Sequence, residues 1–480
     1  MNKAELLQHL ENKYDQMAAV SAAVWSTPEL GFKEFESIKP LVNTLEAEGF
    51  AVEIGVAEVP TAFVGTWGEG KPVIGFLGEF DALPGLSQVA GQVKHEAIVE
   101  GGNGHGCGHN ALGTGCLAAA IGLKDYLKAN NLKGTVKYFG CPGEETGSGK
   151  VFMAREGVFD DTDIALAWHP SDHNEVVSCS SLADTNYYFK FKGKPAHAAA
   201  CPELGRSALD ACELTNVGVN YLREHMIDQA RIHYAYVNAG CSAPNVVHDE
   251  AIINYEIRAP KIEDAVALAK RVIKVAQGAA LMTETELEII EKESMCNVIP
   301  VESLDKLMYE SMIEVGAPKF TDEDYAFAQG FRVGLTEEEK CGDYLKSKKA
   351  LGVKNFEQAQ ELSKKGLADQ FLPFKYDPDY IMSGSTDVGD VSYVTPTSTV
   401  HIASWSLGVQ AHTKESTAQS NSPICHKGLL CAGKIMALTA VKLVEDPSLV
   451  SKIQAEHKVL VPNGYVCPIS KDIKAVDIKK

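Results

Sequence analysis

Three short apolar segments constrain the fold of this chain most strongly. They begin at Val73 (VIGFLG), Thr135 (TVKYFG) and Ile164 (IALAW), and they are rich in β-branched and aromatic residues. Consecutive apolar positions of this kind are typical of strands buried on both faces of a sheet. A helical pattern that begins near Asn110 separates the first two segments. Alternating strands and helices predict an α/β fold with a mostly parallel sheet flanked by helices.

A second pattern of strands and helices is predicted from near Thr185 to Lys292. Its order is strand, helix, two strands, helix and strand, which is the order of a small ferredoxin-like α+β domain. The α/β pattern resumes afterwards, so we interpret 185–292 as an insertion that divides the α/β domain into a first part, 1–184, and a second part, 293–480. A chain of 480 residues is long enough for two to three domains. The charged, mostly helical stretch 309–380 has no assigned role.

The net charge and composition exclude some classes of binding partner. The formal net charge is −19, and no run of lysine and arginine is interleaved with aromatic residues, so we expect no nucleic-acid partner. The amino terminus lacks the apolar core of a signal peptide, and no stretch approaches the ~18 consecutive apolar residues of a membrane span. Twelve cysteines are scattered without a disulfide-like spacing. We therefore expect a soluble, cytoplasmic protein with no membrane partner and with reduced, mostly buried cysteines.

The side chains that follow the predicted strands matter most, because ligands of open α/β sheets bind at the carboxyl ends of the strands. Asp81 follows the first strand, and His169 follows the third. Cys107 and His109 lie two apart in GNGHGCGHN, a glycine-rich approach to a helix, where a thiolate and an imidazole can converge on a metal. The alternative for the pair is a turn with a buried thiol, and for His169 an ordinary core histidine.

Adjacent carboxylates follow the second strand. Glu144 and Glu145 come after the turn CPG, so one can bind metal while the other takes a proton from water. The alternative is a solvated acidic loop. His426 begins the last helix, where a simple capping role is the alternative. Taken together, one cysteine, three histidines and two glutamates at strand and helix ends indicate a metal site.

The chain also resembles a known family, the aminoacylase-type di-metal peptidases, in the amidohydrolase branch that includes the auxin-conjugate hydrolases. The motifs that carry the resemblance follow one another along nearly the whole chain: WSTPELGFKEFES, GEFDALPG, GHGCGHN, GCPGEETGSGK, AWHP, AHAAACPELGRSALDA, PNVVHDEAIINYEIRAP, SGSTDVGDVS and CHKGLL. The resemblance implies a di-zinc-peptidase-like catalytic domain, with the inserted domain acting as a lid and dimerisation domain.

The resemblance assigns roles to the candidate residues. It implies Glu144 as general base and acid, and Asp81 as the carboxylate that orients a histidine ligand. Cys107 would bridge the two ions. The implied protein ligands of two divalent metal ions per subunit are Cys107, His109, Glu145, His169 and His426.

Residues of the inserted domain also match the family. His197 would reach into a partner subunit's active site and stabilise the oxyanion, while Asn245 and Arg258 would grip substrate. The alternatives are a turn residue for His197 and a surface residue for Arg258. The chain departs from the wider branch at Asn110, where aspartate is usual, and at His248, where proline is usual. Both departures concern substrate contacts rather than metal binding.

The resulting expectation is a metal-dependent amidohydrolase of N-acyl amino acids. By resemblance the preferred substrate is p-aminobenzoyl-glutamate, cleaved to p-aminobenzoate and glutamate in folate catabolism, with dipeptides or other N-acyl amino acids as the alternative. The donor atoms favour zinc, and the resemblance favours manganese. The assembly would be a homodimer or a heterodimer with a paralogous subunit. Two rivals remain open, a non-catalytic partner subunit, and a thiol enzyme with Cys107 as nucleophile and His109 as its base.

Overall fold

The computed structural model describes residues 1–342 and 356–478, and the chain forms two compact units. Unit 1 comprises Met1–Cys179, Ile299–Tyr380 and Val391–Tyr465. Unit 2 comprises Ser180–Val298, Ile381–Asp390 and Val466–Lys480. The predicted insertion, 185–292, lies wholly within unit 2, and two short segments from later in the chain join it there.

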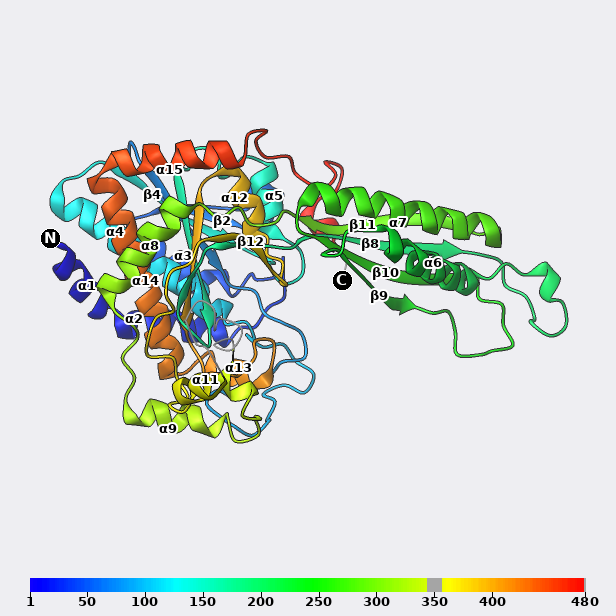
Figure 1. Ribbon diagram of the computed structural model, residues 1–480, viewed down its shortest axis with the longest axis horizontal. Coiled ribbons are helices and arrows are strands. Elements are labelled where there is room, and N and C mark those ends of the chain that lie inside the picture. Colours follow the sequence, from blue (N-terminus) through cyan, green and yellow to red (C-terminus); the bar gives the residue numbers. More distant parts are fainter. Residues whose placement is uncertain (343–355, 479–480) are drawn as a thin grey trace. The chain divides into compact units, whose positions relative to one another are not determined.

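A seven-stranded sheet forms the centre of unit 1, in the order β1-β2-β4-β3-β5-β13-β6 (Figure 1). Strands β4, β3, β5 and β13 are parallel, whereas β2 and β6 run antiparallel to their neighbours. Every residue of β3 is buried, as expected for a strand covered on both faces. This sheet confirms the predicted α/β class. Its strands are β1 (Ala51–Ile54), β2 (Phe63–Glu69), β3 (Val73–Glu79), β4 (Gly134–Cys141), β5 (Ile164–Ser171), β6 (Glu175–Val177) and β13 (Thr397–Ala403).

Helices α4 and α14 pack together in the main core of unit 1 and against the sheet. The backbone of α4 approaches β5 so closely that a Cβ on Gly115 would lie 2.4 Å from Nε1 of Trp168, so only glycine fits. The Trp168 indole in turn donates a hydrogen bond to the Leu112 carbonyl at 2.8 Å. These contacts fix the start of α4 over the carboxyl end of the sheet. Among the described residues, the α-helices that lie wholly in unit 1 are α1 (Lys3–Glu11), α2 (Tyr14–Trp25), α3 (Ile38–Ala47), α4 (His109–Asn130), α5 (Gly149–Arg155), α8 (Glu302–Val315), α9 (Asp322–Gly330), α11 (Phe356–Ser363), α13 (Lys414–Gln419), α14 (Pro423–Glu445) and α15 (Pro447–Leu460).

The stretch 309–380, which the sequence left without a role, contains the end of α8 with α9 and α11, a 3-10 turn at Glu339–Cys341 and most of β12 (Asp377–Met382). Residues 343–355 of this stretch lie outside the described residues. Strand β12 pairs with β7 (Cys179–Ser181), and α12 (Val388–Val394) follows.

Unit 2 is built on a four-stranded antiparallel sheet with the order β11-β8-β10-β9. Along β10, buried positions alternate with less buried ones, as expected when one face of a sheet is covered. Helices α6 and α7 pack together and against this sheet. The order along the chain is the predicted ferredoxin-like one: β8 (Ala183–Lys192), α6 (Ala208–Leu222), β9 (Arg231–Asn238), β10 (Glu250–Ala259), α7 (Ile262–Thr283) and β11 (Glu286–Met295).

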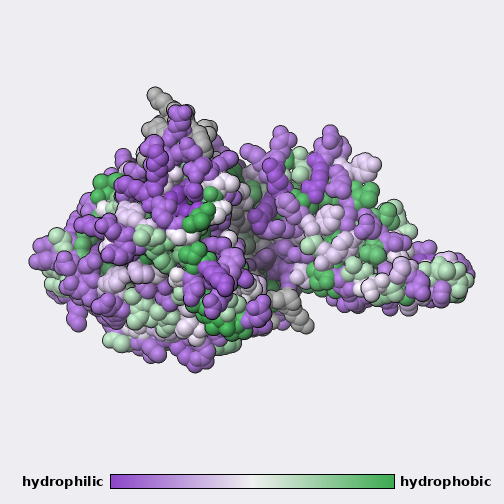
Figure 2. Space-filling view, turned by 90° about the horizontal axis from the view of Figure 1, so that it is seen from below, coloured by the Kyte–Doolittle hydropathy of each residue, from purple (hydrophilic) through white to green (hydrophobic). Residues whose placement is uncertain are grey.

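The surface agrees with the charge of the sequence. Hydrophilic side chains cover most of the face shown in Figure 2, and hydrophobic ones lie among them in small groups. In the described part of the chain, no helix has both the length and the apolar character that crossing a membrane requires. All twelve cysteines are free, and eight of them are buried.

Candidate metal centre

The turn before α4 brings Cys107 and His109 to the sheet edge. Gly108 between them has a φ of +76°, a left-handed conformation that glycine adopts without strain, and His109 is the first residue of α4. Cys107 and His109 are both buried. His169 comes from β5, and its Nε2 lies 3.4 Å from the Cys107 Sγ. The ligand atoms of these three residues lie within 4.8 Å of one another, so the sequence prediction that they converge agrees with the geometry.

Two further groups overlap with this one. Cys107 and Glu145 form a group with His412, and His109 forms a group with Glu79 and Glu144. Cys107 and His109 each belong to two of the groups, so the groups overlap at these two residues. Glu79 is paired with Lys150, and we call the remaining residues the strand-end cluster: Cys107, His109, Glu144, Glu145, His169 and His412.

Asp81 holds two members of the cluster in place. One of its oxygens, Oδ1, lies 2.8 Å from the His109 Nδ1, and its Oδ2 accepts a hydrogen bond from the Glu145 backbone N–H at 2.9 Å. The His109 Nδ1 is therefore the nitrogen that carries the proton, and Nε2 is directed at the other members of the cluster. This is the arrangement by which a carboxylate orients a metal-binding imidazole.

Two atoms of the cluster are buried, and their contacts with the described residues are ion-pair contacts that lack hydrogen-bond geometry. They are the His109 Nε2 and the Glu145 Oε1, and 3.9 Å separates them. Buried polar atoms are nearly always satisfied, so atoms of this kind indicate a missing ligand. A thiol, imidazoles and carboxylates are donors that divalent ions such as zinc accept. The residues present therefore fit a divalent metal centre.

The pKa values of the cluster reflect burial and the close approach of opposite charges. Burial raises the pKa of the Cys107 thiol well above its ordinary value, and the Glu145 carboxylate raises it further. A thiol in such surroundings is a poor nucleophile, which weighs against the thiol-enzyme rival. Burial alone would raise the pKa of Glu145, but His412 and His109 lower it to about 2.

A buried ion pair lies behind the cluster. The Lys150 Nζ contacts the Glu79 Oε1 at 2.6 Å, and the Glu79 Oε2 lies 3.3 Å from the His109 Nε2. Burial alone would raise the pKa of Glu79, but Lys150 together with His109 lowers it below its ordinary value. Glu79 thus remains a carboxylate beside His109.

The turn that carries Glu144 and Glu145 rests on another buried carboxyl group. The Glu34 Oε1 accepts a hydrogen bond from the Gly143 backbone N–H at 2.9 Å, and its Oε2 accepts one from the Thr61 hydroxyl at 2.7 Å. Burial, with a smaller effect of Asp81, raises the pKa of Glu34 to about 8. Glu34 therefore stabilises the turn that carries Glu144 and Glu145.

The structure does not bring His426 into the cluster. His426 lies in the first turn of α14, where its Nε2 contacts the Asn421 Oδ1 at 3.2 Å. No group of described residues with ligand atoms within 4.8 Å of one another includes it. His412 occupies the corresponding place, with its Nε2 3.2 Å from the Glu145 Oε1.

Sequence reasoning missed His412, although a signal existed. His412 lies in the loop that follows β13, the fourth parallel strand, so it reaches the same sheet edge by the rule that identified His169. Its backbone hydrogen bond to the Gly106 carbonyl, at 2.9 Å, and its φ of 62° position it beside Cys107.

The candidate residues of unit 2 lie in two places. His197 and Asn245 are exposed and belong to neighbouring loops, joined by the Ala198 N–H, which donates to the Asn245 carbonyl at 2.9 Å. Arg258 lies near the end of β10, where its Nε is 3.3 Å from the Asp184 Oδ2 and its guanidinium also contacts Glu256. Arg258 is therefore already paired with two carboxyl groups.

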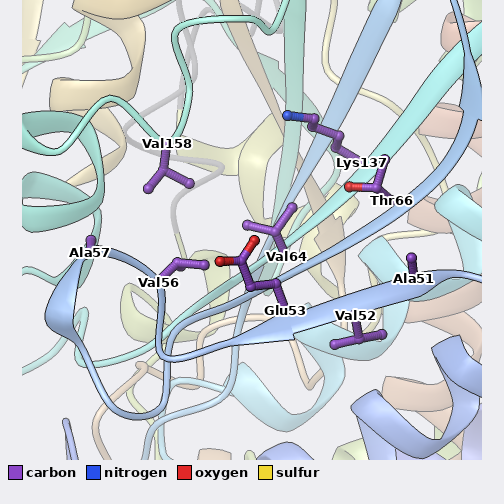
Figure 3. A pocket seen from close by; sticks show the side chains of 9 residues that line it. All are labelled: Ala51, Val52, Glu53, Val56, Ala57, Val64, Thr66, Lys137 and Val158. Atoms are coloured by element: carbon purple, nitrogen blue, oxygen red, sulfur yellow. The ribbon is translucent and has the colours of Figure 1, made fainter.

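A groove of about 470 Å³ lies on unit 1 but shares no residue with the cluster (Figure 3). Its charged side chains are Glu53 and Lys137, and Lys137 is paired with Asp161 at 2.7 Å. The groove contains no set of converging polar groups, so we assign it no chemistry. Its lining residues are Ala51, Val52, Glu53, Val56, Ala57, Val64, Thr66, Lys137 and Val158.

Comparisons with known proteins agree with this geometry. Residues 75–330 match the family model described as peptidase family M20/M25/M40. The chain is 42% identical over 462 residues to one subunit of the p-aminobenzoyl-glutamate hydrolase of Escherichia coli (strain K12), which covers 96% of each chain. It is 28% identical to the Xaa-Arg dipeptidase of Mus musculus, over 95% of this chain and 92% of the relative.

A solved structure shares the fold. A dinuclear metal-binding peptidase of the M20 family from Bacillus subtilis has a TM-score of 0.56 and 17% sequence identity, over 91% of this chain and 99% of that chain.

Proposed function

Because the chain belongs to peptidase family M20/M25/M40, we propose that it hydrolyses p-aminobenzoyl-glutamate to p-aminobenzoate and glutamate. The chain is a metal-dependent hydrolase that acts on amide bonds. The observation that carries the choice of substrate is its 42% identity, over 96% of both chains, to a hydrolase subunit with that substrate in its name. This reaction would place the chain in folate catabolism.

We further propose two divalent ions per chain, held by the strand-end cluster. Cys107 would bridge them, in support of which its sulfur belongs to two of the overlapping donor groups. His109, Glu145 and His169 would complete the set together with His412, which takes the place first given to His426 because its Nε2 lies beside Glu145. The thiolate and imidazoles favour zinc, and manganese is the alternative.

Glu144 is the proposed general base and acid. Bound divalent ions would supply Lewis-acid polarisation of the amide carbonyl and make a water more acidic. Glu144 would take the proton of the attacking water and hand it to the leaving amine, since its carboxylate lies near His109 and is only partly buried. Asp81 holds His109 and the Glu145 backbone in place during these transfers.

Hydrolysis by the purified chain alone is the first test. The chain is stripped of metal with a chelator, zinc or manganese is added back separately, and glutamate release from p-aminobenzoyl-glutamate is measured. We expect metal-dependent release. Absence of release with both metals, while an N-acyl amino acid or dipeptide is cleaved, would contradict the proposed substrate but not the amidohydrolase class.

Substitution Glu144→Gln tests the assigned base. It keeps the size of the side chain and removes its basicity, so turnover should fall by about 10²–10⁴-fold while bound metal is unchanged. The metal content by elemental analysis is the control. Unchanged turnover would refute the role, and loss of metal would indicate that Glu144 is a ligand instead. A non-catalytic partner subunit would show no turnover before substitution.

The proposed role of unit 2 is that of a lid and dimerisation domain. His197 would stabilise the oxyanion in a partner subunit's site, and Asn245 and Arg258 would bind the substrate, with the guanidinium facing a carboxylate. Support comes from the exposed position of His197 and Asn245 on adjoining loops. The assembly would be a homodimer, or a heterodimer with a paralogous subunit, since the Escherichia coli relative is named as one of the subunits of its hydrolase.

Mixing two inactive variants tests the shared site. His197→Ala and Glu144→Gln chains are mixed after subunit exchange has been verified, and activity is measured. We expect partial recovery, because one site in a mixed dimer then contains both residues. No recovery after verified exchange would remove the shared-site proposal. The twelve free cysteines fit a reducing compartment, and we propose the cytoplasm as the location.

A further inference from the structure

A second group of metal-type donors lies beside the strand-end cluster, on strands that the proposed function leaves without a role. His401 on β13 pairs directly with His169 on β5 and with Glu175 on β6. Residues that pair directly across neighbouring strands project from the same face of a sheet. The register therefore places His169, His401 and Glu175 in one row, with His401 in the middle.

His173 completes this group from the connection between β5 and β6. Its Nε2 lies 2.9 Å from the Glu175 Oε1, and the His401 Nδ1 lies 3.9 Å from the same oxygen. The ligand atoms of His173, Glu175 and His401 all lie within 4.8 Å of one another. Three donors on one tetrahedral zinc ion, with bonds of about 2.0–2.2 Å, are roughly 3.3 Å apart. Small side-chain rotations would bring the three to that spacing.

Asp172 orients His173 as Asp81 orients His109. The Asp172 Oδ1 lies 2.7 Å from the His173 Nδ1, and its Oδ2 accepts a hydrogen bond from the Gly408 backbone N–H at 2.9 Å. The Ser171 Oγ also lies 3.1 Å from the His173 Nδ1. The Nδ1 is thus occupied, and the Nε2 is left to face Glu175, which is the carboxylate–imidazole arrangement of metal sites.

We propose that His173, Glu175 and His401 bind a further divalent cation of the zinc type. This inference goes beyond the proposed hydrolase function and does not depend on it. Two imidazoles and one carboxylate are a donor set for zinc that leaves a coordination position open. The His173 side chain is 4% exposed, whereas those of Glu175 and His401 are 27% and 22% exposed. The site therefore has a solvent-facing side for ion entry and for a water ligand.

The site is separate from the strand-end cluster, although the two are neighbours. The His169 and His401 ring centroids are 5.8 Å apart. Both nitrogens of His169 are occupied on its own side, because Nε2 faces Cys107 at 3.4 Å and Nδ1 contacts the Pro170 carbonyl at 2.7 Å. His401 contacts the second group, with its ring centroid 5.9 Å from that of His173 and its Nδ1 3.9 Å from the Glu175 Oε1.

A metal-free ion-pair network is the competing explanation. A protonated His173 can donate to Asp172 and Glu175 at once, and these carboxylates raise the pKa of His173 well above its ordinary value although burial lowers it. The two explanations differ in what zinc does. A metal-free ion-pair network would bind no zinc, whereas the proposed site binds one zinc ion per chain.

Zinc stoichiometry of the full chain tests the proposal. Metal-free protein is dialysed to equilibrium against zinc chloride, and bound zinc is counted by elemental analysis. Glu175→Gln and His401→Gln should each bind one zinc fewer per chain than the wild type. The matched control His233→Gln removes an exposed histidine on β9 and should bind as many as the wild type. Equal zinc in wild type and Glu175→Gln would overturn the proposal.

A second arm separates this site from the proposed catalytic metals. His109→Ala should lower zinc at the strand-end cluster only, so its loss and that of Glu175→Gln should add in the double variant. If Glu175→Gln lowers the amount of bound zinc and His109→Ala does not, the proposed catalytic metal centre is contradicted and the new site is supported. Anomalous scattering from zinc-soaked crystals should show a peak among His173, Glu175 and His401, and a peak at Cys107 alone would overturn the proposal.

Discussion

The strand-end cluster of unit 1 and the His197–Asn245 loops of unit 2 show two ways of placing candidate functional residues. In the cluster, Cys107 and His109 are buried, and the Asp81 carboxylate holds the His109 ring and the Glu145 backbone. In the loops, His197 is exposed, and its Nδ1 accepts hydrogen bonds from the backbone N–H groups of Ala199 and Ala200, both at 3.2 Å. The strand-end cluster is organised by contacts within one chain. The His197–Asn245 loops are held only locally, so a functional role would require a second binding surface.

Removing the cation behind the cluster should have the largest effect. Lys150→Met would leave the Glu79 carboxylate buried without its partner, and loss of one member of a buried pair costs about 3–5 kcal/mol. Chemical denaturation of the metal-free chain measures the free energy of unfolding. The matched control is Lys137→Met, whose partner Asp161 is 62% exposed, and it should cost less than about 1 kcal/mol. Equal effects would show that burial does not organise the cluster.

Replacing each of the two candidate histidine ligands by alanine should have the next largest effect. His412→Ala should weaken zinc binding at the cluster by more than about 100-fold, because loss of a ligand costs more than the 10–100-fold typical of a ligand's supporting partner. His426→Ala should change it by less than about threefold, since its Nε2 contacts only Asn421 among the described residues. Competition with a zinc-chelating dye measures both affinities. The reverse order would restore His426 as the ligand.

This pair of histidines also shows how far the sequence predicts the site. Cys107, His109 and His169 were predictable because each follows a buried strand or begins a helix, and strand ends meet at one edge. His412 was missed although it also follows a buried strand, because its place depends further on the path of the loop after β13 and on a left-handed residue, neither of which has a periodic signal. His426 matched a helix start, but its Nε2 contacts Asn421 and not a member of the cluster.

The same limit holds for the fold. The buried strands and the β-α-β-β-α-β order were confirmed, since hydrophobic periodicity encodes both. The pairing of His401 with Glu175 was not predictable, because β6 is only three residues long and register between distant strands leaves no local trace. Tertiary contacts decide such details.

Asp81→Asn should have the next effect. The amide keeps the shape but loses the charge that holds the His109 Nδ1 proton and the Glu145 N–H, so zinc affinity should fall about 10–100-fold. The measurement is the same dye competition, with circular dichroism as the control for folding. Unchanged affinity would mean that the buried contacts of His109 alone set its orientation.

Glu34 should make the free energy of unfolding of the metal-free chain depend on pH. Its pKa is raised from 4.5 to about 8 in the folded chain, so its contribution is fully present below pH 4.5 and is lost as the pH rises through about 8. In metal-free protein the wild type should lose up to ~1.4 kcal/mol per pH unit relative to Glu34→Gln across this window. Glu46→Gln, an exposed control, should show no such trend. A constant difference would contradict the assignment.

His197→Ala should have the smallest effect on stability and so separates the two regions most directly. His197 is exposed and its Nδ1 contacts only nearby backbone, so the free energy of unfolding should change by less than about 0.5 kcal/mol. Zinc content should also be unchanged, while amide hydrolysis is lost if the residue acts in a partner's site. A variant with full activity would mean that the exposed loops have no catalytic role, and that the buried cluster of one chain is sufficient.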